Sequence, residues 1–231
     1  AHFVGHPLLD RVRSSLSLEE FCQHLNMHPT GLRIGMLPGS RRQEVRALLP
    51  VLRAAAEQLS ARRPEVQFVL ALAPSISEEE VQRLFAGSAV QWRIARQMTY
   101  EVMAHSHLLW CCSGTATLEA AIFGTPMIIL YRGSWLMELE YVLRRRWLRL
   151  TFIGLPNLIA GRSVCPELIQ RAATPEAIVA HTMELLPGTE AYRAQREALQ
   201  EVTSVLGEPG ATERAARLLL ECSGVEHVAA R

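Results

Sequence analysis

The composition of the chain is that of a globular protein. The sequence has 231 residues, of which 49% are hydrophobic, and its 24 basic and 23 acidic side chains leave a formal charge of +1. This length and hydrophobicity provide for a substantial core, which excludes a disordered chain. The balanced charge excludes a global field that attracts nucleic acid, so any anion-binding function must be local.

The first 30 residues are expected to form a connector with a short helix over Leu18 to Leu25. They lack the basic-then-apolar pattern of a signal peptide, and no apolar run of the chain approaches the roughly 20 residues of a membrane span. The five cysteines form no C-x-x-C pair, which is typical of a reducing compartment. We therefore expect a cytoplasmic protein that contacts a membrane, if at all, at its surface.

From Leu32 onward, short apolar runs alternate with amphipathic stretches. This pattern predicts parallel strands joined by helical crossovers, and therefore a doubly wound α/β domain over residues 31–187. The runs are hydrophobic throughout, as in strands that are buried on both faces. The predicted strands are Arg33 to Leu37, Val66 to Ala73, Gln91 to Ala95, Leu108 to Cys112, Met127 to Tyr131 and Thr151 to Ile153.

Capping residues mark the predicted helices. Ser40 followed by Gln43 predicts a capping box, and Ser75 or Ser77 is expected to cap the next helix. Beyond Pro156 every predicted element is helical, and residues 188–231 are expected to form a C-terminal helical extension. The predicted helices are Ser40 to Ala61, a helix from Glu78, Thr115 to Gly124, Pro166 to Ala172, Pro175 to Leu186, Thr189 to Leu206 and Ala211 to Glu221.

Ligands of an open parallel sheet bind past the carboxyl ends of its strands, so the strand-to-helix turns are candidate sites. The first candidate is the turn from Leu37 to Arg41. Gly39 permits a close backbone approach, the following helix offers N–H groups, and Arg41 adds a cation. The turn is either a phosphate site or an ordinary capped turn with an exposed arginine.

The second candidate turn, Cys112 to Glu119, has small hydroxyl residues and glycine before a helix. Glu119 can accept two hydrogen bonds from the vicinal hydroxyls of a ribose, or it can simply lie near the positive end of the helix dipole. Together the two turns suggest a nucleotide. The chain has no lysine, which excludes a P-loop, and it lacks the G-x-G-x-x-G fingerprint of nicotinamide and flavin enzymes.

Three further features have alternative readings. Asn157 and Arg162 flank an apolar stretch in an expected loop after Leu155, at the ligand-binding edge, and either contact a phosphate or sugar or serve the structure. The basic run Arg144 to Arg149, with its Trp147, either rests on anionic lipid or forms a solvated helix end. The His105-x-His107 pair lacks a third ligand nearby, so we expect no metal site.

Four segments in the same order and spacing resemble the lipid-A-disaccharide synthase family. They are Val4 to Pro7, Leu37 to Arg41 with Glu44, Ser113 to Glu119, and Leu155 to Arg162 with Pro166 to Gln170. The resemblance covers nearly the whole chain and is lowest over Gly133 to Leu150 and after Pro187. It implies the C-terminal half of a GT-B fold, in which two Rossmann-like domains face each other across a cleft.

The resemblance also implies a function. The donor would be UDP-2,3-diacylglucosamine, the acceptor 2,3-diacylglucosamine 1-phosphate, and the product the β(1→6)-linked disaccharide precursor of lipid A. No metal or other cofactor is expected, and the C-terminal helices suggest a homodimer. The alternatives are another GT-B UDP-sugar transferase, such as the peptidoglycan N-acetylglucosaminyltransferase, a UDP-sugar epimerase, or a UDP-binding module without turnover.

Residue roles follow from the resemblance by matching position. Arg41 is the one candidate for a direct part in catalysis, since the acidic catalytic residue of the family lies N-terminal to this segment. The chain is therefore expected to bind the donor but not to transfer the sugar alone. The residues expected to bind the donor are Gly39, Ser40, Arg41 and Glu44 at the first turn, Ser113, Gly114, Thr115 and Glu119 at the second, and Asn157 and Arg162 beyond them.

Overall fold

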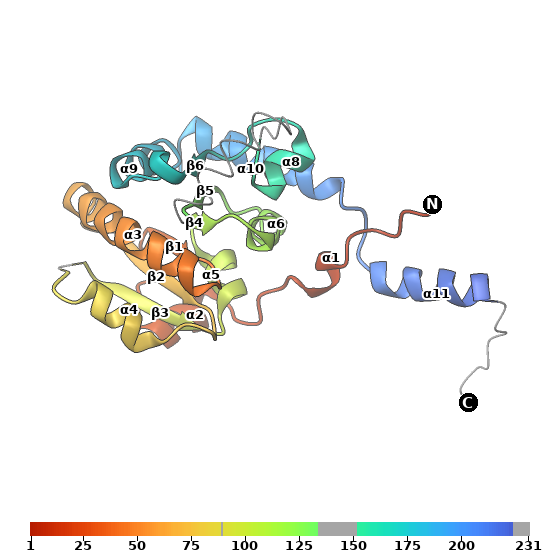
Figure 1. The fold of residues 1–231 in the computed structure, drawn as a ribbon, viewed down its shortest axis with the longest axis horizontal. Coiled ribbons are helices and arrows are strands. Elements are labelled where there is room, and N and C mark those ends of the chain that lie inside the picture. The colour runs from red at the N-terminus through yellow and green to blue at the C-terminus, as the bar shows by residue number, and fades with distance from the viewer. Residues whose placement is uncertain (89, 134–151, 224–231) are drawn as a thin grey trace.

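A computed structural model describes residues 1–88, 90–133 and 152–223 of the chain. Its centre is a sheet of six parallel strands in the order β3-β2-β1-β4-β5-β6 (Figure 1). The chain moves outward from β1 to β3, returns, and then moves outward on the other side from β4 to β6. This order confirms the doubly wound α/β fold. The strands are β1 Arg33–Leu37, β2 Gln67–Leu72, β3 Trp92–Arg96, β4 Leu108–Cys112, β5 Met127–Tyr131 and β6 Glu167–Ile169.

Helices cover both faces of the sheet (Figure 1). One hydrophobic cluster joins alternate strand residues, such as Ile34 and Trp110, to α3, α4 and α9, and the other joins Val69 and Leu109 to α2, α5, α6 and α10. Successive side chains of a strand point to opposite faces, so one apolar run supplies both clusters. The helices are α1 Leu8–Arg11, α2 Leu18–Leu25, α3 Arg42–Arg62, α4 Glu78–Phe85, α5 Thr99–His105, α6 Thr115–Ile122, α8 Leu155–Ala160, α9 Pro175–Glu184, α10 Glu190–Ser204 and α11 Ala211–Ser223.

The predicted capping box at the first turn is wrong. Helix α3 begins at Arg42, and the residue at its N-cap is Arg41, whose side chain makes no capping hydrogen bond. Ser40 lies one residue too early to cap the helix, and its carbonyl oxygen accepts a hydrogen bond from Ser75 Oγ at 2.7 Å. Ser77 takes the N-cap position of α4, but its side chain makes no capping hydrogen bond either.

The predicted position of the last strand is wrong. Phe152 and Ile153 are not part of a strand, and Thr151 lies outside the described residues. The sixth strand is instead the segment Glu167–Ile169, where a helix was expected, and Ile129 of β5 is opposite Glu167 in the register. The stretch expected to be a loop after Leu155 forms the short helix α8, which has a proline in its first turn and ends at a glycine. Proline is common in the first turn of a helix, and glycine is common directly after its last residue.

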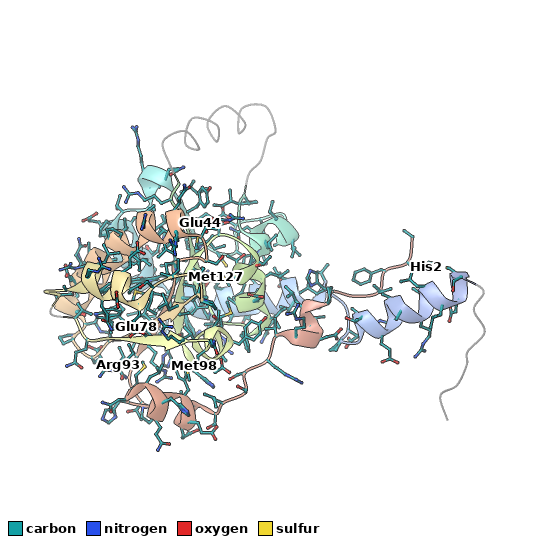
Figure 2. All side chains as sticks on the ribbon, turned by 60° about the horizontal axis from the view of Figure 1, so that its bottom comes forward. His2, Glu44, Glu78, Arg93, Met98 and Met127 are labelled. Carbon is teal, nitrogen blue, oxygen red and sulfur yellow. The ribbon has the colours of Figure 1, made fainter. Side chains whose placement is uncertain are left out.

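The two C-terminal helices differ in their packing. Helix α10 packs on α6 and α8, and its Leu199 and Val202 are buried in the second cluster. Helix α11 extends away from the sheet and lies beside α1 and the N-terminal segment (Figure 1). In Figure 2, His2 lies toward the end of α11 that is farther from the sheet, and Glu44 lies in the body of the domain. Leu219 of α11 is 72% exposed, so this helix, unlike α10, is not part of the cover of the sheet.

The N-terminal connector is held by α11 and the turn before it. Arg214 Nε donates to Val4 O at 2.9 Å, and the carboxylate of Asp10 accepts from the main-chain N of Gly210 and Thr212. Within the three described stretches, no helix is long and apolar enough to cross a membrane. The basic run from Arg144 lies outside them.

Candidate functional site

The two candidate turns meet at one cavity of about 450 Å³ at the carboxyl edge of the sheet. They are adjacent because β1 and β4 are neighbours, with Leu37 opposite Cys111, and because the chain winds in opposite directions on either side of this pair. Ligands bind at such switch points in doubly wound sheets. The residues that line the cavity are Leu37, Gly39, Ser40, Arg41, Glu44, Ala71, Ala73, Thr99, Cys112, Ser113, Gly114, Thr115, Ala116 and Glu119.

The structure therefore brings eight of the ten expected donor-binding residues together around one cavity. Their roles toward a ligand stay predictions. The first of them, Gly39, has a φ of +105°, and a Cβ there would lie 2.9 Å from Glu44 Oε2 and 3.3 Å from Cys112 Sγ. Glycine is needed for this backbone conformation, and an added Cβ would require the Glu44 carboxylate and the Cys112 thiol to shift.

Arg41 and Glu44 form an ion pair at the mouth of the cavity. Arg41 Nη1 lies 2.8 Å from Glu44 Oε1, and the two side chains are 82% and 15% exposed. A guanidinium carries five N–H donors, and Glu44 uses one of them. Arg41 can therefore remain paired with Glu44 while it donates to a phosphate.

The second turn presents backbone to the cavity. Gly114 has a φ of +148°, and the space where its Cβ would lie is open within 4 Å. Helix α6 begins directly after it, at Thr115, and the first amide groups of a helix lack partners within the helix. Ser113 points its hydroxyl elsewhere: its Oγ donates to Ile153 O at 3.1 Å. The donors that this turn offers to an anion are thus mainly main-chain N–H groups.

Glu119 lies on α6 beside the cavity, one turn after Thr115. Its Oε1 accepts a hydrogen bond from Tyr100 Oη at 3.2 Å. Tyr100 belongs to α5, a helix that was not predicted, and no motif in the sequence singled it out. Beneath the turns, burial raises the pKa of Cys112 to about 12, so its side chain is a neutral thiol at neutral pH rather than a nucleophile.

The charges around the cavity favour an anion only in part. Among its described lining residues one side chain is cationic, Arg41, and two are carboxylates, Glu44 and Glu119. The remaining positive potential comes from the N-termini of α3 and α6, each equivalent to a fraction of a charge. This arrangement is suited to a ligand with a phosphate at the turns and neutral hydrogen-bond donors, such as hydroxyls, at the carboxylates.

The last two expected residues do not line this cavity. Asn157 is fully buried in α8. Its Nδ2 donates to Cys165 O at 2.8 Å and Glu167 Oε1 at 2.7 Å, and its Oδ1 accepts from the main-chain N of Val164 and Cys165. The side chain thus connects α8 to the segment that leads into β6. All of these hydrogen bonds are internal, so the structure places Asn157 in the packing between α8 and β6 and outside the cavity.

Arg162 likewise lies away from the cavity. Its exposed guanidinium pairs with Glu201 of α10 at 2.7 Å, and it lines a separate hollow with His181 and Gln195. The sequence suggested a loop because an asparagine and an arginine flank a short apolar stretch. The structure places the asparagine, buried, within the short helix α8, and the arginine, exposed, just beyond the end of that helix.

The two histidines noted in the sequence have structural roles. His105 Nε2 lies 2.8 Å from Leu16 O, and His107 Nδ1 accepts a hydrogen bond from Arg33 N at 3.0 Å. Burial, together with the charge of Arg33, lowers the pKa of His107. In the described part of the chain, no group of three or more His, Cys, Asp or Glu side chains is placed to hold a metal ion.

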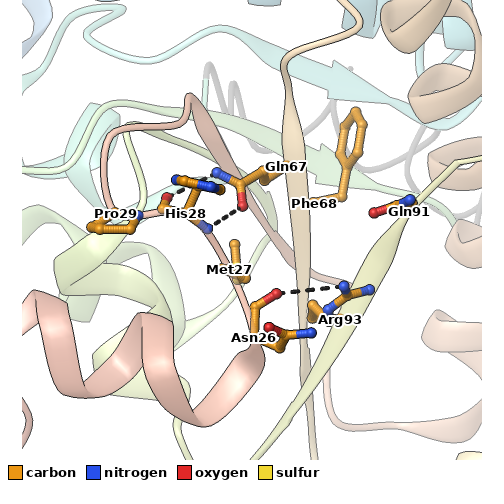
Figure 3. A pocket seen from close by; sticks show the side chains of 8 residues that line it. All are labelled: Asn26, Met27, His28, Pro29, Gln67, Phe68, Gln91 and Arg93. Carbon is orange, nitrogen blue, oxygen red and sulfur yellow. Dashed lines mark hydrogen bonds between the residues drawn. The ribbon is translucent and has the colours of Figure 1, made fainter.

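A second cavity of about 300 Å³ lies near the amino ends of β2 and β3, at the opposite edge of the sheet (Figure 3). Its polar groups hold the loop that follows α2. Gln67 exchanges two hydrogen bonds with the main chain of His28, at 2.7 and 2.9 Å, and Arg93 Nε donates to Leu25 O at 2.9 Å. None of the residues expected to bind the donor lies there.

Comparison with known proteins adds to this geometry. The model of the family described as LpxB, lipid-A-disaccharide synthetase, matches residues 1–221. The lipid-A-disaccharide synthase of Persephonella marina is 36% identical over 226 residues, which are 96% of this chain and 59% of the relative. That of Geobacter metallireducens is 39% identical over 222 residues, 96% of this chain and 57% of the relative. The chain thus spans a little over half the length of these relatives.

Solved structures share the fold at low sequence identity. The S. aureus MnaA-UDP co-structure has a TM-score of 0.60 at 15% identity over 96% of this chain and 54% of its own. The UDP-GlcNAc 2-epimerase of Neisseria meningitidis bound to UDP-GlcNAc has 0.59 at 17% identity over 88% and 48%. At this identity they show the fold alone, a GT-B half. The family model and the relatives show more: the chain belongs to the lipid-A-disaccharide synthase family.

Proposed function

We propose that this chain is the donor-binding half of an inverting UDP-sugar glycosyltransferase. The donor is UDP-2,3-diacylglucosamine, the acceptor is 2,3-diacylglucosamine 1-phosphate, and the products are UDP and a β(1→6)-linked disaccharide. The observation that carries the proposal is the single cavity between the turns of Gly39 and Gly114, in a chain of this family. Because both substrates carry acyl chains, we place the reaction at the cytoplasmic surface of a membrane.

Each part of the cavity has a role in this proposal. The diphosphate lies between the N-termini of α3 and α6, where Gly39 and Gly114 let it approach the main chain. Arg41 uses the donors that Glu44 leaves over and neutralises the charge that develops on the leaving UDP. Glu119 accepts hydrogen bonds from the ribose hydroxyls.

These groups stabilise the leaving group but do not account for sugar transfer. A helix N-terminus contributes about 0.3 to 2 kcal/mol and a charge-assisted hydrogen bond about 1.5 to 3 kcal/mol. Enzymes lower barriers by about 8 kcal/mol or more, and an inverting transfer also needs a base and a held acceptor. We assign those to the part of the enzyme that precedes this segment in the longer relatives, and we expect this chain alone to bind UDP without turnover.

Calorimetric titration of the folded chain with UDP tests the proposal. Arg41→Ala is expected to weaken UDP binding about 10-fold or more, because a charge-assisted hydrogen bond to the diphosphate is lost. Glu119→Ala is expected to weaken it about 3- to 10-fold. Arg46→Ala is the matched control: Arg46 is also exposed on α3 and ion-paired, to Glu80 at 2.6 Å, but it does not line the cavity.

The result that contradicts the proposal is a folded wild-type chain that does not bind UDP. Binding that is equal in the wild type, Arg41→Ala and Glu119→Ala places UDP elsewhere. Titration with uridine separates the contribution of Arg41 to phosphate binding from that of Glu119 to ribose binding. Arg41→Ala should not change the affinity for uridine, which has no phosphates.

A further inference from the structure

We propose that Tyr100 is a positioning residue that orients the carboxylate of Glu119, and that it thereby sets the preference of the cavity for ribonucleoside over deoxyribonucleoside diphosphates. This inference rests on the proposed function, in which Glu119 holds the ribose. It adds a residue outside the two turns, and it identifies a hydrogen bond between helices as the source of sugar selectivity.

The first observation is the hydrogen bond itself. Tyr100 is the second residue of α5, and its Oη donates to Glu119 Oε1 on α6 at 3.2 Å. The carboxylate of Glu119 makes no other hydrogen bond within residues 1–88, 90–133 and 152–223. A carboxylate has about four acceptor positions, so the phenol takes one and leaves the others to a ligand. The bond orients the carboxylate without saturating it.

The second observation is that the phenol is itself held in place. Its ring is half-buried and packs against the ring of Phe123, with centroids 6.0 Å apart and an angle of 55° between the planes. Phe123 follows the last residue of α6, so this helix contacts Tyr100 at two points. Burial, together with the charge of Glu119, raises the pKa of Tyr100, and the hydroxyl remains a donor at neutral pH.

The consequence for binding follows from preorganisation. A glutamate on a helix surface samples several rotamers, and a ligand that needs one of them must immobilise the side chain. When the phenol already holds the carboxylate, the ribose hydroxyls meet an ordered acceptor. Loss of the phenol should therefore weaken only those ligands that bind Glu119 through hydroxyls, by about 2- to 10-fold.

The test compares UDP with 2′,3′-dideoxy-UDP, which lacks both hydroxyls, in calorimetric titrations of the 231-residue chain. Tyr100→Phe keeps the ring on Phe123 and removes the donor. We expect Tyr100→Phe to bind UDP about 2- to 10-fold more weakly than the wild type and to bind dideoxy-UDP equally well. The preference for UDP over dideoxy-UDP should therefore decrease by the same factor. In the Glu119→Ala background the same change should have no further effect on UDP.

Two further variants complete the design. Tyr100→Met also lacks the hydroxyl and must narrow the ratio in the same way, which covers the case in which Tyr100→Phe does not fold. Tyr192→Phe on α10 is the matched control, because it removes a phenol that neither hydrogen-bonds to Glu119 nor lines the cavity, and both affinities should be unchanged.

The outcomes separate this inference from the proposed function. If the wild-type chain binds UDP and both Tyr100 variants keep its preference for UDP over dideoxy-UDP, the role of Tyr100 is overturned and the donor site stands. An equal loss for both ligands also overturns it, since that is the signature of a distorted cavity. If the folded wild type does not bind UDP, the proposed function is overturned and the role of Tyr100 with it.

Discussion

Replacement of Asn157 by alanine tests whether this residue serves the fold or the ligand. Its side chain is fully buried and makes four hydrogen bonds, two as donor and two as acceptor, at 2.7 to 2.8 Å. A net contribution of about 0.5 to 1.5 kcal/mol for each bond gives about 2 to 6 kcal/mol. Alanine also leaves the main-chain N–H groups of Val164 and Cys165 without these acceptors. We expect Asn157→Ala to lower the free energy of unfolding by about 3 to 5 kcal/mol, a large part of the total for a domain.

Urea unfolding monitored by tryptophan fluorescence, to which the buried Trp110 contributes, measures this loss. Arg162→Ala is the matched control from the same segment: its exposed pair with Glu201 should contribute less than about 1 kcal/mol. UDP affinity of the folded Asn157→Ala protein should stay within about 3-fold of the wild type, less than a lost charge-assisted bond. Wild-type stability combined with loss of UDP binding would show that the residue contacts the ligand and would refute the reasoning.

The remaining predictions concern the glycines of the two turns and His107. Gly39→Ala should lower the free energy of unfolding, measured with urea, by more than Gly114→Ala does. In both variants, backbone strain at a positive φ costs about 1 to 3 kcal/mol, but only the new Cβ at residue 39 comes close to Glu44 and Cys112. Equal losses would contradict this. Burial and the charge of Arg33 lower the pKa of His107 in the folded chain. As pH falls, this histidine is therefore protonated in the unfolded chain before it is protonated in the folded chain. The stability that neutral His107 provides is thus present above the ordinary histidine pKa and is lost as pH falls from that value toward the lowered pKa of the folded chain. The advantage of the wild type over His107→Asn in urea unfolding should thus shrink from pH 7.5 to 5.5, and parallel pH profiles would contradict it.

The sheet and the place of the cavity could be predicted because the central strands are continuous and mostly apolar runs. Strands β1, β4 and β5 begin and end at the predicted residues, since each is a five-residue run followed by a proline or a polar residue. Parallel strands place their carboxyl ends at one edge, and that geometry brings Gly39 and Gly114 together without any knowledge of side chains.

The short elements could not be predicted, because tertiary contacts decide them. Strand β6 has three residues and no periodicity of its own, and its pairing with β5 overrides the helical pattern of the sequence around Glu167. The buried role of Asn157 depends on partners eight and ten residues later, at Cys165 and Glu167. Tyr100 meets Glu119 only because α5 and α6 pack together.

A crystal structure of the chain with UDP tests the central claim most directly. We expect the diphosphate at the first turns of α3 and α6, within hydrogen-bond distance of Arg41, and the ribose hydroxyls on Glu119. UDP bound at the opposite edge of the sheet, in the cavity of Gln67 and Arg93 (Figure 3), would contradict it.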